Sequence, residues 1–456
     1  MSKDPDMRHR PRNVLFLMAD QLRYDWLSCN GGAWCPTPNL DRLASMGTRF
    51  TQCVTNSPVC MPARIGLATG LRPHRLGAVD NLGHIPPWAP CYYRHLRDHG
   101  YRVVLRGKAH LDAVEAMDED LPRAAPRPYL REVGFTDAIE YEGKVVSSWA
   151  TAPRSPYTWR LHERGLLDRY REAYQRRRHG NWVDTDAQPS PLPEEDHIDR
   201  VIADEALDWI GTSAAEAQPW YLFVSFSGPH SPYDPPARWA ERFADASMPA
   251  PLPFAEDRAN TWLKPGGKSF GFTPAQVLAF RRSYSGLVAH IDEQVGRILD
   301  ALEERGRLND TILVFTSDHG DDLGDYDHIA KCVPMEHAIR VPLMVAGGGM
   351  PAGAVSDARC ELNDAQATVC DLAGLPPLLG SEARSLAAQP SGRDVQVSTY
   401  KDFWLIRDHR YKYIEVMRGD RYLFDLDSDP HETRNLAGGA LEIAEALRRR
   451  LRGELA

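Results

Sequence analysis

The sequence is constrained most strongly by a set of unbroken apolar runs, each of which stops abruptly at polar residues. The first run, NVLFLMA at residues 13–19, ends at Asp20. Continuous rather than alternating hydrophobicity is typical of a strand that is buried on both faces of a sheet. Four later runs have the same character, at residues 101–107, 220–226, 311–317 and 341–347. We therefore expect a sheet that is covered on both sides.

Helical patterns lie between these runs. Residues 37–47 begin with a capping threonine and an early proline, carry spaced leucines and end at a glycine. Two longer helices are predicted at 196–210 and 274–307, where apolar residues recur at helical spacing. Strands that alternate with helices predict an α/β fold, in which helices sandwich a large, mostly parallel sheet.

Residues 112–200 depart from this pattern. They are rich in Pro, Arg and Glu, are weakly periodic, and contain the basic run Arg176, Arg177 and Arg178. One interpretation is a solvated insertion. The other is a lid or oligomer contact that shapes the substrate pocket.

The pattern changes again near residue 380. Four short β-rich segments follow, at 395–400, 403–408, 411–416 and 421–426, and a helical pattern covers 440–451. They predict an antiparallel meander with a final helix, which is a smaller C-terminal α+β subdomain. The predicted division is a catalytic α/β domain at 1–379, which includes the 112–200 insertion, and a C-terminal subdomain at 380–456.

Composition excludes several classes of protein. The net charge of −9 disfavours a nucleic-acid binder. No apolar run approaches the ~20 residues that span a membrane, and the polar N-terminus has no secretory pattern. The eight cysteines include no CxxC pair and form no disulfide framework, which favours a reducing cytoplasm. The oligomeric state, including a homo-oligomer, stays open.

The polar residues at the strand ends suggest a metal site. Asp20 and Gln21 follow the first run, and Asp318 and His319 follow the run at 311–317. A single aspartate here is usually a helix cap or a loop residue. Two such pairs at one sheet edge instead offer two carboxylates, an amide oxygen and an imidazole. Oxygen ligands favour Ca²⁺, Mg²⁺ or Mn²⁺, and the imidazole shifts the preference toward Mn²⁺.

A second set of strand-end residues is cationic or proton-donating. Lys108 and His110 follow one run, His230 follows another, and Lys331 lies downstream of the metal candidates. Each of them alone would more often be an ordinary surface residue. Together they are suited to hold an anion and to protonate a leaving group.

Cys60 lies in the unusual stretch PVCMPARIGLATG, residues 58–70. Pro62 suits a first helical turn, so Cys60 is expected at a helix N-terminus, where negative charge is favoured. Arg64 lies one turn farther along. A buried structural cysteine and a thiolate nucleophile are both open interpretations. Neither explains the spacing of the proline and the arginine.

The pattern Cys-x-Pro-x-Arg at residues 60–64 resembles the signature of the sulfatase family, within the alkaline phosphatase-like superfamily. Three further segments are similar to sulfatase motifs, at 107–111, 316–331 and 422–436. Four ordered similarities between residues 13 and 436 are specific to the family, whereas a single five-residue match would not be.

The resemblance implies a mechanism. A formylglycine-generating enzyme would oxidise Cys60 to formylglycine. One oxygen of its hydrate would attack sulfur, and the other would then expel sulfate and regenerate the aldehyde. Arg64 would steady this group, and Asn81 would bind substrate. One divalent metal would be held by Asp20, Gln21, Asp318, His319 and modified Cys60. The anionic group would be bound by Lys108, His110, His230 and Lys331.

The Asp-Gln and Asp-His pairs depart from most sulfatases. The resemblance places them with choline sulfatases and phosphonate monoester hydrolases, so the choice between Ca²⁺, Mn²⁺ and Mg²⁺ stays open. Phosphonate monoester hydrolases carry hydroxyl side chains at the Lys-x-His positions, so Lys108 and His110 favour a small anionic sulfate ester. The leading hypothesis is a cytoplasmic sulfatase, and the alternative is a phosphonate monoester or phosphodiester hydrolase. A non-catalytic relative that binds an anion or a partner is a third.

Overall fold

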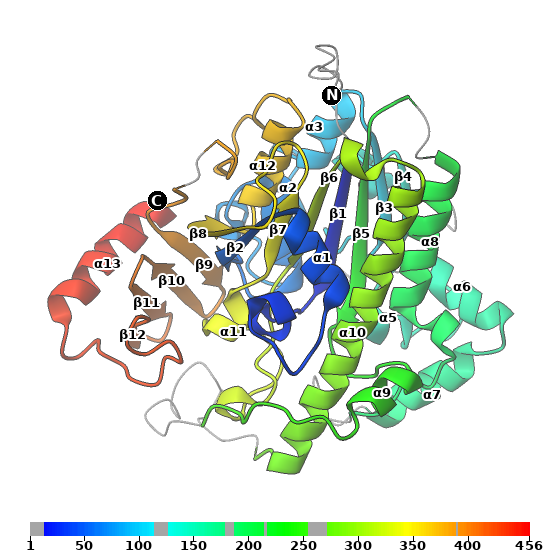
Figure 1. The fold of residues 1–456 in the computed structure, drawn as a ribbon. Helices are drawn as coiled ribbons and strands as arrows, with labels where there is room; N and C mark the ends of the chain where they lie inside the picture. The colour runs from blue at the N-terminus through cyan, green and yellow to red at the C-terminus, as the bar shows by residue number, and fades with distance from the viewer. Residues whose placement is uncertain (1–12, 114–125, 178–186, 214–216, 254–270, 389–390) are drawn as a thin grey trace.

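The computed structural model describes residues 13–113, 126–177, 187–213, 217–253, 271–388 and 391–456. These residues form an eight-stranded sheet of order β4-β3-β5-β1-β6-β7-β2-β8 and a separate four-stranded sheet (Figure 1). The large sheet consists of β1 (Asn13–Asp20), β2 (Gly47–Val54), β3 (Arg102–Gly107), β4 (Asp137–Glu140), β5 (Trp220–Pro229), β6 (Thr311–Ser317), β7 (Leu343–Ala346) and β8 (Ala354–Glu361). Only β7 runs antiparallel to its neighbours. The predicted mostly parallel α/β sheet is confirmed.

The central strand β1 shows why its sequence is continuously apolar. All eight of its residues are buried. Leu15 and Leu17 pack into one core, whereas Val14 and Phe16 pack into the core on the opposite face. The first core lies under α1 (Pro38–Met46), α8 (Ile198–Ser213) and α10 (Pro274–Glu304). The second lies under α2 (Cys60–Thr69), α3 (Tyr92–Asp98), α4 (Pro128–Val133) and α12 (Asp364–Leu372).

All five predicted strands belong to the large sheet, but three strands were not predicted. These are β2, β4 and β8. β8 lies at the sheet edge, where Val355 and Asp357 are exposed, and polar residues interrupt its sequence, so it has no continuous apolar run. β4 is only four residues long. Short or half-solvated strands therefore lack the signal that identifies buried ones.

The described part of the 112–200 region packs into the protein instead of forming a solvated insertion. It supplies the edge strand β4 and the short helices α5 (Lys144–Ser147), α6 (Pro156–Glu163) and α7 (Leu167–Arg177). Tyr157, Tyr170 and Tyr174 are buried in the core that also holds α8 and α10. α5 has only four residues, and α7 is mostly polar, so neither carries a clear apolar period. In the basic run, Arg176 is exposed, Arg177 is buried, and Arg178 lies outside the described residues.

The C-terminal region is the antiparallel meander that the sequence predicts. Its strands are β9 (Gln396–Tyr400), β10 (Phe403–Arg407), β11 (Tyr411–Val416) and β12 (Arg421–Asp425), and the helix α13 (Leu441–Leu455) follows. α13 packs on one face of this sheet. The other face packs against Val54 and Val59, which precede α2. The division at residue 379 stays a prediction.

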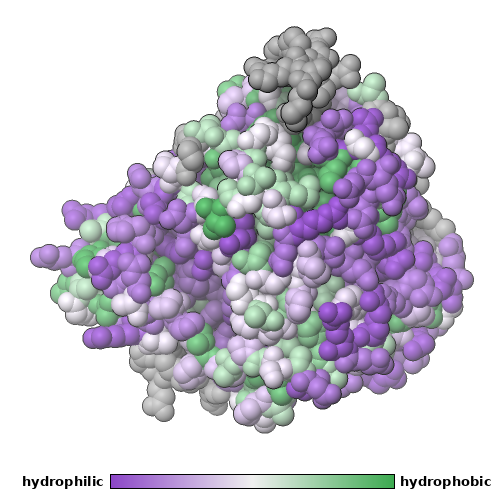
Figure 2. Space-filling view, in the orientation of Figure 1, coloured by the Kyte–Doolittle hydropathy of each residue, from purple (hydrophilic) through white to green (hydrophobic). Residues whose placement is uncertain are grey.

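The visible surface is mostly hydrophilic on its flanks, where α13 and α8 lie, and its apolar residues form scattered groups (Figure 2). Among the helices that the structure describes, none combines the length and hydropathy needed to cross a bilayer. All eight cysteines lie in described segments, and they are free thiols.

Gly107 ends β3 and directs Lys108 toward the sheet edge. Its φ is +108°, and a Cβ would lie 2.0 Å from the carbonyl oxygen of Ser225 on β5. We expect Gly107→Ala to lower the free energy of unfolding by about 2–4 kcal/mol through strain and overpacking. Chemical denaturation measures this loss. Gly438→Ala is the control, because a Cβ at Gly438 meets open space. Equal stability of the two variants would show that β5 tolerates a side chain at residue 107.

Candidate active site

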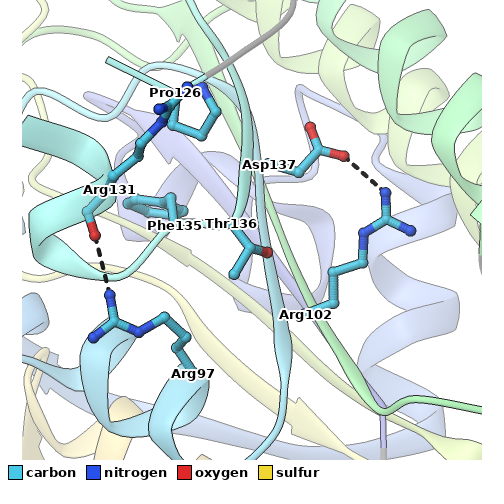
Figure 3. Close-up of a pocket in the computed structure, with 7 residues that line it drawn as sticks. All are labelled: Arg97, Arg102, Pro126, Arg131, Phe135, Thr136 and Asp137. Atoms are coloured by element: carbon cyan, nitrogen blue, oxygen red, sulfur yellow. Dashed lines mark hydrogen bonds and ion pairs between the residues drawn. The ribbon is translucent and has the colours of Figure 1, made fainter. Parts of the chain in front are cut away.

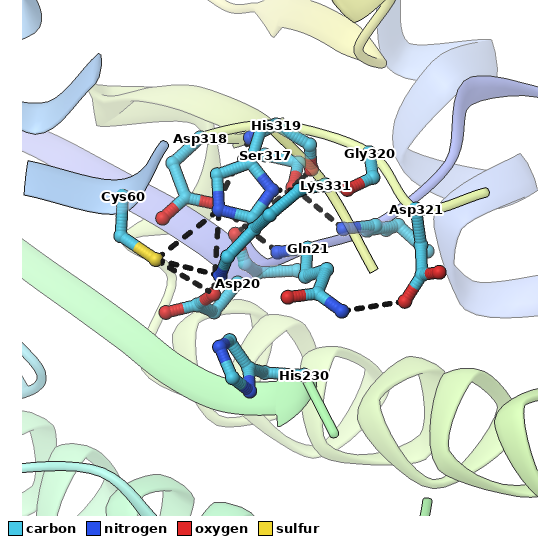
Figure 4. Close-up of polar contacts among 12 residues, drawn as sticks. Asp20, Gln21, Cys60, His230, Ser317, Asp318, His319, Gly320, Asp321 and Lys331 are labelled. Atoms are coloured by element: carbon cyan, nitrogen blue, oxygen red, sulfur yellow. Dashed lines mark hydrogen bonds and ion pairs between the residues drawn. The ribbon is translucent and has the colours of Figure 1, made fainter. Parts of the chain in front are cut away.

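The polar residues that follow four predicted strands meet at one edge of the large sheet. β3, β5, β1 and β6 are adjacent and parallel, so their carboxyl ends coincide. Figure 4 shows several of these side chains converging on one point. The residues brought to this edge are Asp20, Gln21, Lys108, His110, His230, Asp318 and His319.

Cys60 joins this group as the first residue of the helix α2, and not from the end of a strand. Its side chain is only 2% exposed. The sulfur lies 2.9 Å from Lys331 Nζ, 3.2 Å from His319 Nε2 and 3.7 Å from Asp20 Oδ1. Pro62 lies in the first turn of the helix, where its missing N–H is tolerated. The expected position of Cys60 at a helix N-terminus is confirmed.

Arg64 ties the strand ends together. Its guanidinium donates from Nε to Asp318 Oδ2 (2.8 Å) and from Nη2 to Asp20 Oδ2 (3.3 Å). Nη1 donates to the Lys108 carbonyl and to Ser225 Oγ. Arg64 is 2% exposed, so these interactions occur out of water. It influences Cys60 through charge and through the two carboxylates it orients.

Four buried side chains, Asp20, Cys60, Asp318 and His319, place their potential ligand atoms within 4.8 Å of one another. His319 Nδ1 lies 2.9 Å from the Gly320 carbonyl, which can only accept, so Nδ1 carries the proton. In the neutral ring, which metal binding requires, the lone pair of Nε2 faces the cluster. This arrangement is typical of a metal-ligating histidine. In the metal-free chain burial opposes a charged His319 ring, but Asp318 outweighs burial, raises the pKa of His319 and favours the protonated ring.

Gln21 completes the donor set. Its Nε2 donates to Asp321 Oδ2 at 2.5 Å, whereas its buried Oε1 has no hydrogen-bond partner among the described residues. Figure 4 shows that oxygen on the side of Asp20. Tyr233 Oη also donates to Asp321 Oδ2, at 2.7 Å, and so fixes that carboxylate. An orphaned buried carbonyl oxygen beside two carboxylates and an imidazole fits a divalent cation.

Sequence reasoning missed the role of Asp321 and Tyr233 as supports of Gln21. Asp321 belongs to the same polar run as Asp318 and His319. Its side chain, however, contacts Gln21, which lies 300 residues earlier in the chain, and Tyr233 belongs to the loop after β5. Only the fold brings the three together.

The cationic and proton-donating residues lie close to Cys60. Lys108 Nζ donates to Asp20 Oδ2 at 2.5 Å. His230 Nδ1 donates to the Ser231 carbonyl at 2.5 Å, which leaves its Nε2 unprotonated when the ring is neutral. His110 is buried and lies close enough to Cys60 to shift the pKa of that thiol, but in the part of the chain that the structure describes neither ring nitrogen has a hydrogen-bond partner of ordinary geometry.

The electrostatics of this edge favour an anion at Cys60. Burial raises the pKa of the Cys60 thiol, but the charges of Lys108, Lys331 and His319 outweigh it and hold that pKa well below its usual range. Burial lowers the pKa of His110 and of His230, so both rings favour the neutral form.

Asn81 lies beside the start of α2. Its Oδ1 accepts a hydrogen bond from the backbone N–H of Met61, at 3.1 Å. Asn81 thus contacts the residue that follows Cys60. The same hydrogen bond gives a partner to one of the free backbone N–H groups at the start of the helix.

A separate pocket of about 610 Å³ lies at the amino ends of β3 and β4, away from the strand ends just described (Figure 3). It contains Arg97, Arg102 and Arg131. Arg102 pairs with Asp137, and Arg97 donates to the Arg131 carbonyl. None of the sequence-predicted site residues lines this pocket.

The Sulfatase family model matches residues 12–375. This chain belongs to the sulfatase family. It is therefore a hydrolase of the alkaline phosphatase-like superfamily, as the motifs indicated. The chain is 28% identical to the choline-sulfatase of Rhizobium meliloti (strain 1021), over 93% of this chain and 82% of that protein. It is also 28% identical to an arylsulfatase of Clostridium perfringens, over 93% and 90% of the two chains.

Among solved structures, the phosphonate monoester hydrolase of Agrobacterium radiobacter is similar to this sulfatase-family chain. The TM-score is 0.79 at 25% identity, over 98% of this chain and 96% of that one. Similarity thus extends to the C-terminal sheet, which lies beyond the family-model match.

The charge environment of Cys60 yields a prediction for the unmodified, chelator-treated chain. We expect its thiol to ionise well below the ordinary value of about 8.5, because nearby cations stabilise the thiolate. Lys331→Met removes one cation and should move the midpoint upward. The measurement is the pH dependence of thiolate ultraviolet absorbance, as a difference from Cys60→Ser. The exposed Lys401→Met should leave the midpoint unchanged, and an unshifted Lys331→Met would refute the assignment.

Proposed function

We propose that this protein hydrolyses a small anionic sulfate monoester with formylglycine formed from Cys60 and one divalent metal. The observation that carries the proposal is the position of Cys60, which is at the start of α2 and within 3.7 Å of Lys331, His319 and Asp20 side-chain atoms. The formylglycine hydrate would supply a geminal diol, one hydroxyl of which attacks sulfur while the other later expels sulfate.

The proposed metal ligands are Asp20, Gln21, Asp318, His319 and modified Cys60. Bound there, Ca²⁺, Mn²⁺ or Mg²⁺ would supply Lewis-acid stabilisation of charge on the ester oxygens. The two carboxylates are held by Arg64, and the Gln21 oxygen is turned toward them by Asp321. The protein thus fixes the donor atoms through neighbouring hydrogen bonds rather than leaving them free to rotate.

The remaining residues bind the anion and manage a proton. Lys108 and Lys331 both lie close enough to Cys60 to lower the pKa of its thiol, and they would offset charge on the sulfate oxygens. His110 and His230 are the candidates to protonate the departing oxygen, which either ring can do once it carries a second proton. Asn81 would bind substrate through its amide group.

Described residues from the 112–200 region support a substrate-shaping role. A Cβ at Gly143 would lie 3.9 Å from Lys108 Cδ, so this loop passes beside the anion site. Lys144 Nζ donates to the Pro232 carbonyl (2.7 Å) and pairs with Asp234 (2.8 Å), in the loop that carries His230. The region is thereby attached to two groups that would face the substrate.

A phosphonate monoester hydrolase is the second candidate, because a solved enzyme of that name shares 25% identity and a TM-score of 0.79 with this chain. Lys108 and His110 favour sulfate, as argued from the motifs. The ratio of kcat/KM on an aryl sulfate to that on an aryl phosphonate monoester decides between them. A larger value for the phosphonate would overturn the proposal.

The modification itself is tested by mass spectrometry of the peptide that contains residue 60, after co-expression with a formylglycine-generating enzyme. An aldehyde-reactive tag should attach at residue 60. A thiol that is still fully alkylatable would remove the proposed nucleophile.

Two substitutions should separate nucleophile from anion binding. Cys60→Ala is expected to abolish sulfate hydrolysis. Lys108→Met should lower kcat/KM by about 10²–10³-fold, because it removes a donor aimed at developing charge. Lys401→Met is the matched control, since Lys401 is exposed. Activity retained by Cys60→Ala would place the chemistry elsewhere.

The Gln21–Asp321 hydrogen bond predicts a rescue in metal binding. Asp321→Asn should weaken Mn²⁺ binding about 10–100-fold, because Gln21 loses its carboxylate acceptor. Gln21→Glu should also weaken it, since a second carboxylate would lie against Asp321. The double variant should recover affinity, because the new amide at position 321 can donate to the new carboxylate at position 21 and turn its other oxygen inward. Calorimetric titration of the metal-free chain measures this. Additive losses in the double variant would contradict the proposed orientation.

A further inference from the structure

The C-terminal motif at 422–436 has no place in the chemistry described above, although the sequence analysis singled it out. One of its residues, Glu432, is fully buried and has a φ of +53°. It forms an ion pair with Lys412 of β11, which is also fully buried. A buried ion pair is costly to desolvate and is weak evidence for stability alone. We therefore look for the role of the Lys412–Glu432 pair in the other residues that it contacts.

The pair holds a short segment that begins at Lys331. Glu432 Oε2 accepts the backbone N–H of Glu336, at 2.8 Å. Lys412 Nζ donates to the Pro334 carbonyl (2.8 Å) and to Glu336 Oε1 (3.1 Å). In Figure 1, α11 (Glu336–Ile339) lies beside the four-stranded sheet, in agreement with these bonds.

The near end of the same segment lies against the start of the nucleophile helix. The N–H of Cys332 donates to the Pro58 carbonyl at 3.2 Å, two residues before Cys60. Cys332 has a φ of +73°, so the backbone is held in a sparsely populated conformation directly after Lys331. Such conformations persist where surrounding contacts impose them. On the C-terminal side of Cys332, Lys412 and Glu432 make such contacts, at Pro334 and Glu336.

We propose that Lys412 and Glu432 are positioning residues that hold the 331–336 segment so that Lys331 Nζ stays 2.9 Å from the residue-60 side chain. The C-terminal sheet would thereby serve catalysis without contributing a group that touches the substrate. This inference rests on the proposed role of Lys331 in binding the sulfate group.

The test is a double-mutant cycle. Lys412→Met/Glu432→Gln removes both charges together, which avoids leaving one buried and unpaired. We expect it to lower kcat/KM for the sulfate ester by about 10-fold or more, and by less than about 2-fold when Lys331→Ala is already present. The control is Arg421→Met/Glu445→Gln, an exposed ion pair of 3.1 Å that joins β12 to α13. It should change activity in neither background.

A second measurement distinguishes local displacement from general unfolding. The rate of acylation by an amine-reactive reagent is read at Lys331 and Lys108 by mass spectrometry. We expect the Lys412/Glu432 variant to raise the rate at Lys331 alone, because Lys108 is held by Asp20 instead. An equal rise at both lysines, or none at Lys331, would overturn the positioning role. Equal losses of activity with and without Lys331 would do the same.

The two proposals fail separately. If Lys331→Ala alone leaves sulfate hydrolysis unchanged, the proposed function of Lys331 is wrong, and the positioning role falls with it. If Lys331→Ala is damaging but the Lys412/Glu432 variant is not, only the positioning role is wrong.

Discussion

The site depends on the buried ion cluster that Arg64 forms with Asp20 and Asp318. Two carboxylates buried this close together repel each other, and neither is stable there without a compensating charge. Arg64 supplies charge to both carboxylates with hydrogen bonds of 2.8 and 3.3 Å, and Lys108 supplies a second charge to Asp20. Arg64 also bonds to the ends of β3 and β5. The cluster therefore fixes four strand ends and the helix α2 relative to one another, and the position of Cys60 follows from it.

The same cluster explains how opposing requirements are met in one small volume. A divalent cation needs anionic and neutral oxygen donors, whereas a sulfate group needs cations. The protein separates them by origin. Donor oxygens come from the ends of β1 and β6, and the anion-binding cations come from β3 and from the segment after the metal residues. Lys108 belongs to the anion-binding cations and donates to Asp20, one of the donor carboxylates. The positive charge of one set therefore offsets part of the negative charge of the other.

Regions outside the strand ends support this arrangement from two sides. Lys144 attaches the 112–200 region to the loop of His230, and Lys412 attaches the C-terminal sheet to the segment of Lys331. Both lysines are buried and bind backbone carbonyls, so they restrain the path of a chain segment rather than a single side chain. Loops that carry functional side chains are otherwise the most mobile parts of a fold.

Sequence alone determined the buried strands, because a strand covered on both faces must be continuously apolar, as β1 is. It also determined that Asp20, Lys108, His230 and Asp318 share one edge, since parallel strands end together. Tertiary structure decided the rest. Gln21 pairs with Asp321, which lies far along the chain, and Lys412 pairs with Glu432, which follows the last strand of the meander. The tyrosines of the 112–200 region are buried although their helices are short or mostly polar. Side-chain partners of this kind are set by packing, which hydrophobic patterns do not encode.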